Sequence, residues 1–257
     1  MEKDSWDSKI EYLKSTRENM WNDDYFEFLV KCVWKFDCPK NIVDFGCGYG
    51  YLGMKLLPLL PEGSTYTGID IGDKLLHEAR SIFDGSSFNT SFIQMDLTQY
   101  IPIKQYDIAI CQAVLRHIPQ ARDVLSKMVD SVVPSGMVIC IEVNRQMEEA
   151  GKYVHNINGS GISQNTNIMA VWEDELSQGG RDYMLGIRVP VYMERLGLIN
   201  VGVRLNDFIE FISPQQDNYD NRVNTIVEYG GFNGVEIHDD SSVLFARSLI
   251  VSYGTKK

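Results

Sequence analysis

The chain has 257 residues, a formal net charge of −11 and 44% hydrophobic residues, a length that suits one large domain or one domain with an elaboration. The acidic balance disfavours nucleic acid and anionic membrane surfaces as partners, because both bind clusters of Lys and Arg. No apolar run reaches the ~18 residues of a membrane span. The five scattered cysteines, without a Cys-x-x-Cys pair, predict a cytoplasmic protein with no metal site.

Strand-like and helix-like segments alternate over the first part of the chain. Residues 1–40 are predicted to form a helical cap, with a helix that begins near Asp24 and ends before Pro39. The core at 41–145 then alternates apolar strands with helices, which predicts a parallel sheet covered on both faces. The predicted strands are 41–45, 65–69, 91–95, 106–111 and 137–143, and the predicted helices are about 51–60, 73–83 and 121–133.

The regular alternation of strands and helices ends after the core. Residues 145–195 are predicted to be an insertion, loop-like to 165, with a helix from about Thr166 and another that begins at Pro190. Strands are expected at 198–205 and 243–253, within a C-terminal region of 198–257. Between them lies a polar, irregular insertion at 213–242. We expect all of these parts to belong to one domain of residues 1–257.

A glycine-rich loop follows the first predicted strand and has two interpretations. Gly48-Tyr49-Gly50-Tyr51-Leu52-Gly53 fits the G-x-G-x-x-G pattern of dinucleotide-binding proteins, and Asp70 lies close to the expected ~20 residues beyond it. The second interpretation takes the motif as Asp44-Phe45-Gly46-Cys47-Gly48-Tyr49-Gly50, which begins before Gly48, at Asp44. In the dinucleotide frame the residues between the strand and Gly48 have no role, and neither has Asp44.

The order of motifs from about 41 to 145 resembles the class I methyltransferases that depend on S-adenosylmethionine. Besides the Asp44–Gly50 loop, the similar segments are Thr67-Gly68-Ile69-Asp70-Ile71, Gln94-Met95-Asp96-Leu97, the segment from Tyr106 through Gln112 to Pro119, and Val133-Pro134-Ser135-Gly136-Met137. The resemblance covers some two fifths of the chain. It implies a doubly wound, seven-stranded, mostly parallel sheet with an antiparallel last strand, a helical N-terminal segment and a lid-like insertion.

The resemblance also implies a cofactor and a set of residues that bind it. Asp70 would accept the ribose hydroxyls, Asp96 and the Leu97 N–H would meet the adenine edge, and Ile71 would pack on the ring. The candidate cofactor-binding residues are Asp44, Gly46, Gly48, Asp70, Ile71, Asp96, Leu97 and Gln112. The function implied is methyl transfer to an O, N or C atom of a small molecule. The alternatives are an NAD-dependent oxidoreductase and a cofactor-binding protein that does not catalyse a reaction.

Methyl transfer needs little chemical assistance when the acceptor is aligned, so the family requires no particular catalytic residue. His117, after the fourth core strand, is the candidate general base, although a structural histidine explains the same residue. Aromatic residues of the two insertions are expected either to wall an acceptor pocket or to pack in a core. These residues are Trp172, Tyr183, Tyr192, Tyr219 and Tyr229.

Overall fold

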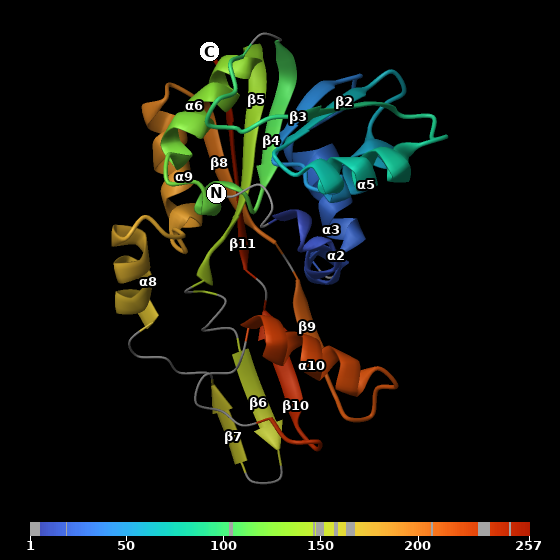
Figure 1. Ribbon diagram of the computed structural model, residues 1–257, viewed down its shortest axis with the longest axis vertical. Helices are drawn as coiled ribbons and strands as arrows, with labels where there is room; N and C mark the ends of the chain where they lie inside the picture. Colours follow the sequence, from blue (N-terminus) through green and yellow to red (C-terminus); the bar gives the residue numbers. More distant parts are fainter. Residues whose placement is uncertain are drawn as a thin grey trace.

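The computed structural model describes residues 6–18, 20–102, 105–145, 147, 152–156, 159–162, 168–206, 208–230, 237–246 and 248–257. Its large sheet contains β1 (Asn41–Phe45), β2 (Thr65–Asp70), β3 (Asn89–Gln94), β4 (Tyr106–Gln112), β5 (Val132–Val143), β8 (Ile199–Leu205) and β11 (Leu249–Thr255). The strands lie in the order β3-β2-β1-β4-β5-β11-β8, and β11 is antiparallel to both neighbours (Figure 1). This arrangement confirms the predicted seven-stranded, mostly parallel sheet and its antiparallel last strand.

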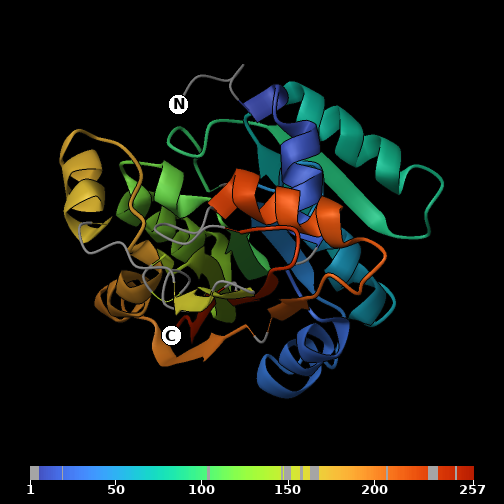
Figure 2. The same ribbon diagram turned by 90° about the horizontal axis from the view of Figure 1, so that it is seen from below.

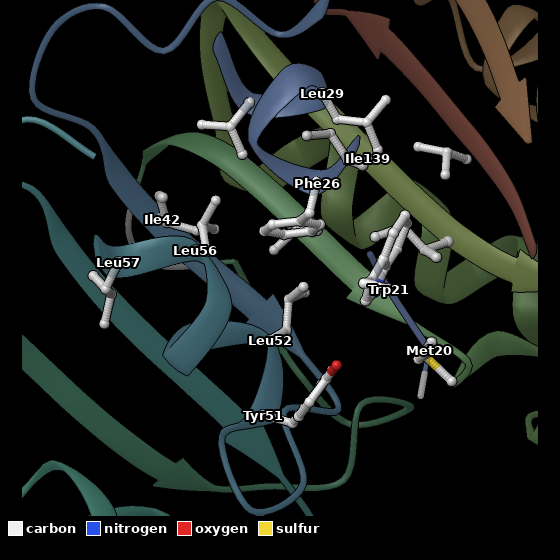
Figure 3. Close-up of a cluster of buried hydrophobic side chains, with 14 of the residues drawn as sticks. Met20, Trp21, Phe26, Leu29, Ile42, Tyr51, Leu52, Leu56, Leu57 and Ile139 are labelled. Carbon is white, nitrogen blue, oxygen red and sulfur yellow. The ribbon is translucent and has the colours of Figure 1, made fainter. Parts of the chain in front are cut away.

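Helices cover both faces of the large sheet because successive strand residues point to opposite faces. Ile42 packs in the cluster under the N-terminal helices, whereas Val43 packs in the cluster on the other face. Figure 3 shows Phe26 and Leu29 in the first of these clusters, with Ile139 of β5 beside them. The helical segments are α2 (Ile10–Glu18), α3 (Asp23–Phe28), η1 (Leu29–Val33), α4 (Tyr51–Leu56), η2 (Leu57–Leu59), α5 (Asp73–Phe83), η3 (Leu115–His117), α6 (Ala121–Ser131), α8 (Ile168–Ser177) and α9 (Leu185–Arg195).

The first insertion and the residues on either side of the second one form a second, small sheet. Its strands are β6 (Lys152–Asn156), β7 (Gly159–Ile162), β9 (Ile209–Ile212) and β10 (Ser242–Ala246), in the order β7-β6-β10-β9, and α10 (Tyr219–Gly230) accompanies them. The small sheet lies beyond the carboxyl ends of the parallel strands, and the view from that side shows α10 crossing in front of the large sheet (Figures 1 and 2).

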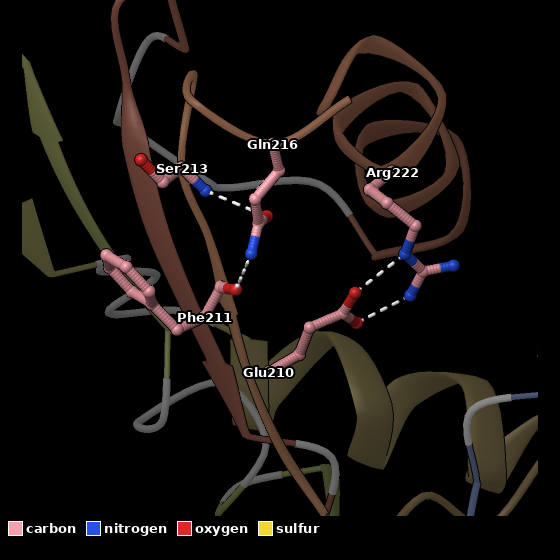
Figure 4. A network of polar contacts seen from close by, with 5 residues as sticks. All are labelled: Glu210, Phe211, Ser213, Gln216 and Arg222. Carbon is pink, nitrogen blue, oxygen red and sulfur yellow. Dashed lines mark hydrogen bonds and ion pairs between the residues drawn. The ribbon is translucent and has the colours of Figure 1, made fainter. Parts of the chain in front are cut away.

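One face of the small sheet packs against α10. Val154, Val243 and Phe245 form a buried cluster with Tyr219 of the helix. A bidentate ion pair adds to this contact. Arg222 of α10 donates to both carboxylate oxygens of Glu210 on β9, at 2.6 and 2.5 Å (Figure 4). The insertions therefore have a core of their own.

The structure corrects four predicted elements. The stretch expected as a loop at 145–165 contains the strands β6 and β7, and the irregular stretch at 213–242 contains α10. The strand expected at 243–253 is two strands, β10 and β11, in different sheets. The helix expected to begin at Pro190 begins at Leu185 and holds Pro190 inside it.

The predicted last strand is two strands because the chain passes from the small sheet to the large one within it. The chain passes from the large sheet to the small one after β8 and returns before β11. Asn206 at the first passage donates its N–H to the carbonyl of Leu249 (3.1 Å) and accepts the Leu249 N–H on its side chain (2.8 Å). Apolar periodicity is the same on either side of such a crossing and does not reveal the change of sheet.

Within the described residues, no helix is long and apolar enough to cross a membrane.

Candidate functional site

A cavity of about 700 Å³ opens at the carboxyl edge of the large sheet. The strand order reverses between β1 and β4, and this is the place where open α/β sheets bind ligands. All nine candidate site residues line the cavity, although they are spread over more than 70 positions of the sequence. They are Asp44, Gly46, Gly48, Asp70, Ile71, Asp96, Leu97, Gln112 and His117. Their roles in binding and catalysis stay predictions.

The glycine loop after β1 presents main chain to the cavity. Gly46 and Gly48 have φ angles of +77° and +55°, a left-handed conformation that other residues adopt at a cost. A Cβ at Gly46 would stand 2.5 Å from a methyl group of Val114, whereas a Cβ at Gly48 would meet nothing within 4 Å. Gly46 is therefore required by packing, and Gly48 leaves room for a ligand against the backbone.

Asp70 ties the loops after β1 and β2 together. Its side chain accepts the Gly48 N–H at 2.8 Å and the Gly72 N–H at 2.9 Å, one on each carboxylate oxygen. Burial raises the pKa of Asp70, while these backbone hydrogen bonds act against the rise. Each carboxylate oxygen can accept a further hydrogen bond, so Asp70 retains acceptor capacity toward the cavity.

Asp44 lies under the same loop and is 1% exposed. The Tyr66 hydroxyl of β2 donates to its Oδ2 at 2.6 Å, while its Oδ1 is buried without a hydrogen-bond partner in the described structure. Burial raises the pKa of Asp44 to about 7, against the lowering effect of the Tyr66 hydrogen bond. A buried carboxylate oxygen without a donor, at the wall of a cavity, suits a cationic ligand group.

Asp96 and its neighbours form the end of the cavity beside β3. Oδ1 of Asp96 accepts the N–H and the hydroxyl of Thr98, each at 2.8 Å, which fixes the turn after the strand. Leu97 is buried, and Ile71 comes from the loop after β2. Asp96, Leu97 and Ile71 all line the cavity, so a carboxylate and aliphatic side chains border it here.

The segment after β4 is held from two sides. Trp21 donates its indole N–H to the Gln112 side-chain oxygen at 2.9 Å, and Ala113 follows with a φ of +56°. Glu142, fully buried on β5, accepts the N–H groups of Val114 and Leu115 at 3.0 and 2.8 Å. Unfavourable backbone held by surrounding structure is common at functional sites.

His117 differs from a free general base in this structure. Its Nε2 accepts a hydrogen bond from Nε of Arg116 at 3.0 Å, and its ring meets Trp6 edge-on at 4.9 Å. Burial and the positive charges of Arg116 and Arg181 lower the pKa of His117 to about 2. The imidazole is therefore neutral at ordinary pH, and its acceptor nitrogen already has a partner.

Sequence reasoning missed several residues of the site. Asp7 accepts the N–H groups of Lys74 and Leu75 at 3.0 and 3.3 Å, so it caps α5 from the N-terminal segment. Arg145 and Arg181 line the cavity from the insertion. None of these three residues belongs to a motif that the sequence analysis identified.

The aromatic candidates divide between wall and core. Tyr183 lines the cavity and stacks on Trp172 at 5.5 Å. Tyr219 packs under the small sheet, and Tyr192 packs against the core beneath α9. The side chain of Tyr229 lies outside the described residues.

Comparison with known proteins identifies the domain that forms this site. Residues 43–138 match the family model of a methyltransferase domain. The chain is 32% identical over 108 residues to a ubiquinone biosynthesis O-methyltransferase of Erwinia tasmaniensis, which is 41% of this chain and 43% of that relative. The chain thus spans about half of the length of such relatives or less.

Solved structures share the fold over nearly the whole chain. An S-adenosylmethionine-dependent methyltransferase from Mesorhizobium loti has a TM-score of 0.51 at 15% identity, over 86% of this chain and 93% of that one. A Haemonchus contortus phosphoethanolamine N-methyltransferase 2, solved with phosphomonomethylethanolamine and S-adenosylhomocysteine, has a TM-score of 0.57 at 12% identity, over 91% of this chain and 53% of that one.

Residues 43–138 are thus a methyltransferase domain, and the fold is the Rossmann-like fold of S-adenosylmethionine-dependent methyltransferases. This finding decides between the two interpretations of the glycine loop in favour of the frame that begins at Asp44. The cofactor of such a domain is S-adenosylmethionine. The described residues fit it, because the unpartnered Asp44 Oδ1 suits an ammonium group and the open space at Gly48 admits a ligand against the backbone.

Proposed function

We propose that the whole chain transfers the methyl group of S-adenosylmethionine to an O, N or C atom of a small molecule. The observation that carries the proposal is the gathering of Asp44, Asp70, Asp96 and Gln112 around one cavity, at the switch point of a methyltransferase domain. The O-methyltransferase named above supports a small-molecule acceptor. Reaction in the cytoplasm is part of the proposal, supported by five cysteines that are all free.

Each candidate residue has a part in holding the cofactor. Asp70 accepts the ribose hydroxyls, and Asp96 accepts the adenine amino group while the Leu97 N–H faces a ring nitrogen. Ile71 packs on the adenine. Asp44 pairs with the ammonium of the methionine portion, Gly46 and Gly48 give it room, and Gln112 closes the cavity on the β4 side.

The chain's own contribution to the reaction is mainly orientation. S-adenosylmethionine supplies a methyl group on a positively charged sulfur, which an aligned nucleophile displaces in line. Holding two reactants in such an alignment accounts for most of the rate in reactions of this type. His117 receives the acceptor's proton where the acceptor has one to lose. For that step its Nε2 must exchange the hydrogen bond from Arg116 for one from the acceptor, and the bound acceptor must raise the pKa of His117 from about 2 toward neutrality.

Two measurements test the proposal. Calorimetry should show that S-adenosylhomocysteine binds to the purified chain, and radiolabelled methyl transfer should appear with at least one compound of a broad metabolite panel. Binding without any transfer would favour a cofactor-binding protein that does not catalyse a reaction. The same panel should include a protein lysate and total RNA, since transfer to either in place of metabolites would contradict the proposed acceptor class.

A further inference from the structure

Glu142 of β5 is a fully buried acid behind the wall of the cavity. Its Oε1 accepts the N–H groups of Val114 and Leu115, at 3.0 and 2.8 Å. Burial raises the pKa of Glu142, and the charge of Arg116 and the backbone N–H groups of the same segment act against the rise. Burying a carboxylate is costly unless charges and donors compensate it. The fold therefore holds an acid at a position where an apolar side chain would be easier to bury.

The backbone after β4 has the shape of an anion-binding loop. Ala113 is left-handed, with a φ of +56°, and Val114 follows in a right-handed conformation, with φ −114° and ψ −52°. Successive N–H groups in a turn of this kind point to one side and form a concavity that binds anions. The Ala113 N–H meets the carbonyl of Ile141 at 2.8 Å, and the next two N–H groups meet Glu142. The Glu142 carboxylate thus occupies the place of a bound anion.

The segment that Glu142 holds forms one wall of the cavity. Four of its residues line the cavity, namely Ala113, Val114, Arg116 and His117. Val114 lies against the glycine loop, since a Cβ at Gly46 would stand 2.5 Å from one of its methyl groups. His117 follows in η3, two residues after the Leu115 N–H that Glu142 accepts. One buried carboxylate is therefore linked both to the glycine loop and to the candidate base.

Other contacts attach the same segment to the fold. Before the turn, Trp21 donates to the Gln112 side chain at 2.9 Å. After the turn, Asp182 donates its N–H to the carbonyl of Arg116 at 3.0 Å. Neither contact uses the N–H groups that Glu142 accepts. A chain without the Glu142 carboxylate should therefore fold, with only the turn between these two contacts loosened.

We propose that Glu142 is a positioning residue for methyl transfer. Its carboxylate fixes the turn at 113–115, which holds Val114 against the glycine loop and His117 at the cavity. The inference rests on the proposed function, because the residues it positions are those proposed to hold the cofactor and to receive a proton. A carboxylate suits this role better than an amide, since hydrogen bonds to an ionised acceptor are roughly twice as strong as neutral ones.

Amide hydrogen exchange, resolved by residue, tests the contact itself. The amides of Val114 and Leu115 should exchange several-fold faster in Glu142→Gln than in the wild type, and faster still in Glu142→Leu, which offers no acceptor. The amide of Ile110, inside the sheet on β4, should keep its wild-type rate. The matched control is Glu194→Gln, exposed on α9, which should change nothing.

Cofactor affinity tests the positioning. In Glu142→Gln, calorimetry should show S-adenosylhomocysteine binding weakened by about fivefold or more, because Val114 is no longer held against the glycine loop. Transfer to any acceptor that the metabolite panel reveals should also slow at saturating cofactor. Unchanged exchange at Val114 and Leu115 would overturn the inference. Faster exchange there with unchanged affinity and rate would make Glu142 a structural residue, and so would equal acceleration at Ile110.

Failure of the proposed function would be distinguishable from failure of this inference. A wild-type chain that binds S-adenosylhomocysteine but transfers no methyl group would contradict the proposed reaction, while weaker binding in Glu142→Gln would still support the positioning of the glycine loop. A wild-type chain that binds no S-adenosylhomocysteine leaves the exchange measurement intact. Faster exchange confined to the turn would then support the hold of Glu142 on it, and unchanged exchange would overturn it.

Discussion

The Tyr66 hydroxyl donates a hydrogen bond of 2.6 Å to Asp44, beneath the glycine loop, and both side chains are buried. The contact explains a glycine that sequence reasoning left without a role. Gly53 of α4 lies against the Tyr66 ring, and a Cβ there would stand 2.9 Å from it. The absence of a side chain at Gly53 therefore leaves room for the Tyr66 ring beneath α4.

The raised pKa of Asp44 predicts a pH dependence of stability. Its folded-state pKa of about 7 lies above the ordinary value of 3.8, so the folded chain binds this proton more tightly than the unfolded chain. Asp44 therefore lowers the free energy of unfolding as pH rises between these values, by up to about 4 kcal/mol. Asp44→Asn should remove this part of the dependence in urea unfolding across that pH range. An unchanged slope would show that Asp44 ionises normally.

Cofactor binding should respond to the same proton in the opposite direction. An ammonium paired with Asp44 favours the ionised carboxylate, so the affinity for S-adenosylhomocysteine should rise as pH increases through about 7. Calorimetry in buffers with different ionisation enthalpies should detect proton release on binding. Asp44→Asn should bind more weakly and release no proton. Release that persists in the variant would assign the proton to another group.

Asp70→Ala should weaken S-adenosylhomocysteine binding by ~1–3 kcal/mol, because hydrogen-bonding groups of ligand and loop lose their partner. The Gly48 and Gly72 N–H groups lose an acceptor in the same variant, so its stability must be measured alongside. Asp84→Ala, at an exposed position just after α5, is the matched control. An affinity equal to that of the wild type would remove Asp70 from the cofactor site.

Two glycine substitutions should separate packing from binding. Gly53→Ala forces a methyl group against Tyr66, and overpacking of this kind costs about 1–3 kcal/mol of stability. Gly48→Ala meets no neighbour but strains a left-handed backbone and fills space at the cavity wall, so we expect its main effect on cofactor affinity. Thermal unfolding and calorimetry on both variants check this. A loss mainly of stability in Gly48→Ala and mainly of cofactor affinity in Gly53→Ala would contradict the described loop geometry.

The amount that sequence could predict differs between the core and the insertions. The residues at the carboxyl edge of the large sheet were predictable, because parallel strands end near recognisable residues such as Asp44, Asp70 and Asp96. The sheet topology alone brings those strand ends together. The small sheet was not predictable, because its strands lie at 152–162 and 209–246, far apart in the sequence, and pair only in the folded chain. Asn206 shows why, since nothing in its neighbourhood marks a crossing between sheets.

The meeting of Arg116, Arg145 and Arg181 at the cavity wall was also beyond prediction. Arg116 stands next to His117 in the sequence, but its position there does not indicate which other cations lie near it. Arg145 and Arg181 join it only through backbone hydrogen bonds between segments that are far apart in the chain. His117, in contrast, was predicted from its position after the fourth core strand. Its position could not predict that the ring is neutral and accepts a hydrogen bond from Arg116.

His117→Ala should slow methyl transfer without weakening S-adenosylhomocysteine binding, because the ring borders the acceptor part of the cavity. His117→Gln offers Arg116 an acceptor oxygen in place of Nε2, so recovery of the rate in this variant would identify a positioning residue. A rate that stays low would support the transfer of a proton to the imidazole. Rates equal to the wild type in both variants would make His117 a structural residue.

Calorimetric titration of the purified chain with S-adenosylhomocysteine and, separately, with NADH tests the central claim most directly. The arrangement of Asp44, Asp70 and Asp96 around the glycine loop predicts saturable binding of S-adenosylhomocysteine, weakened in Asp70→Ala, and no binding of NADH. Binding of NADH without binding of S-adenosylhomocysteine would contradict the account.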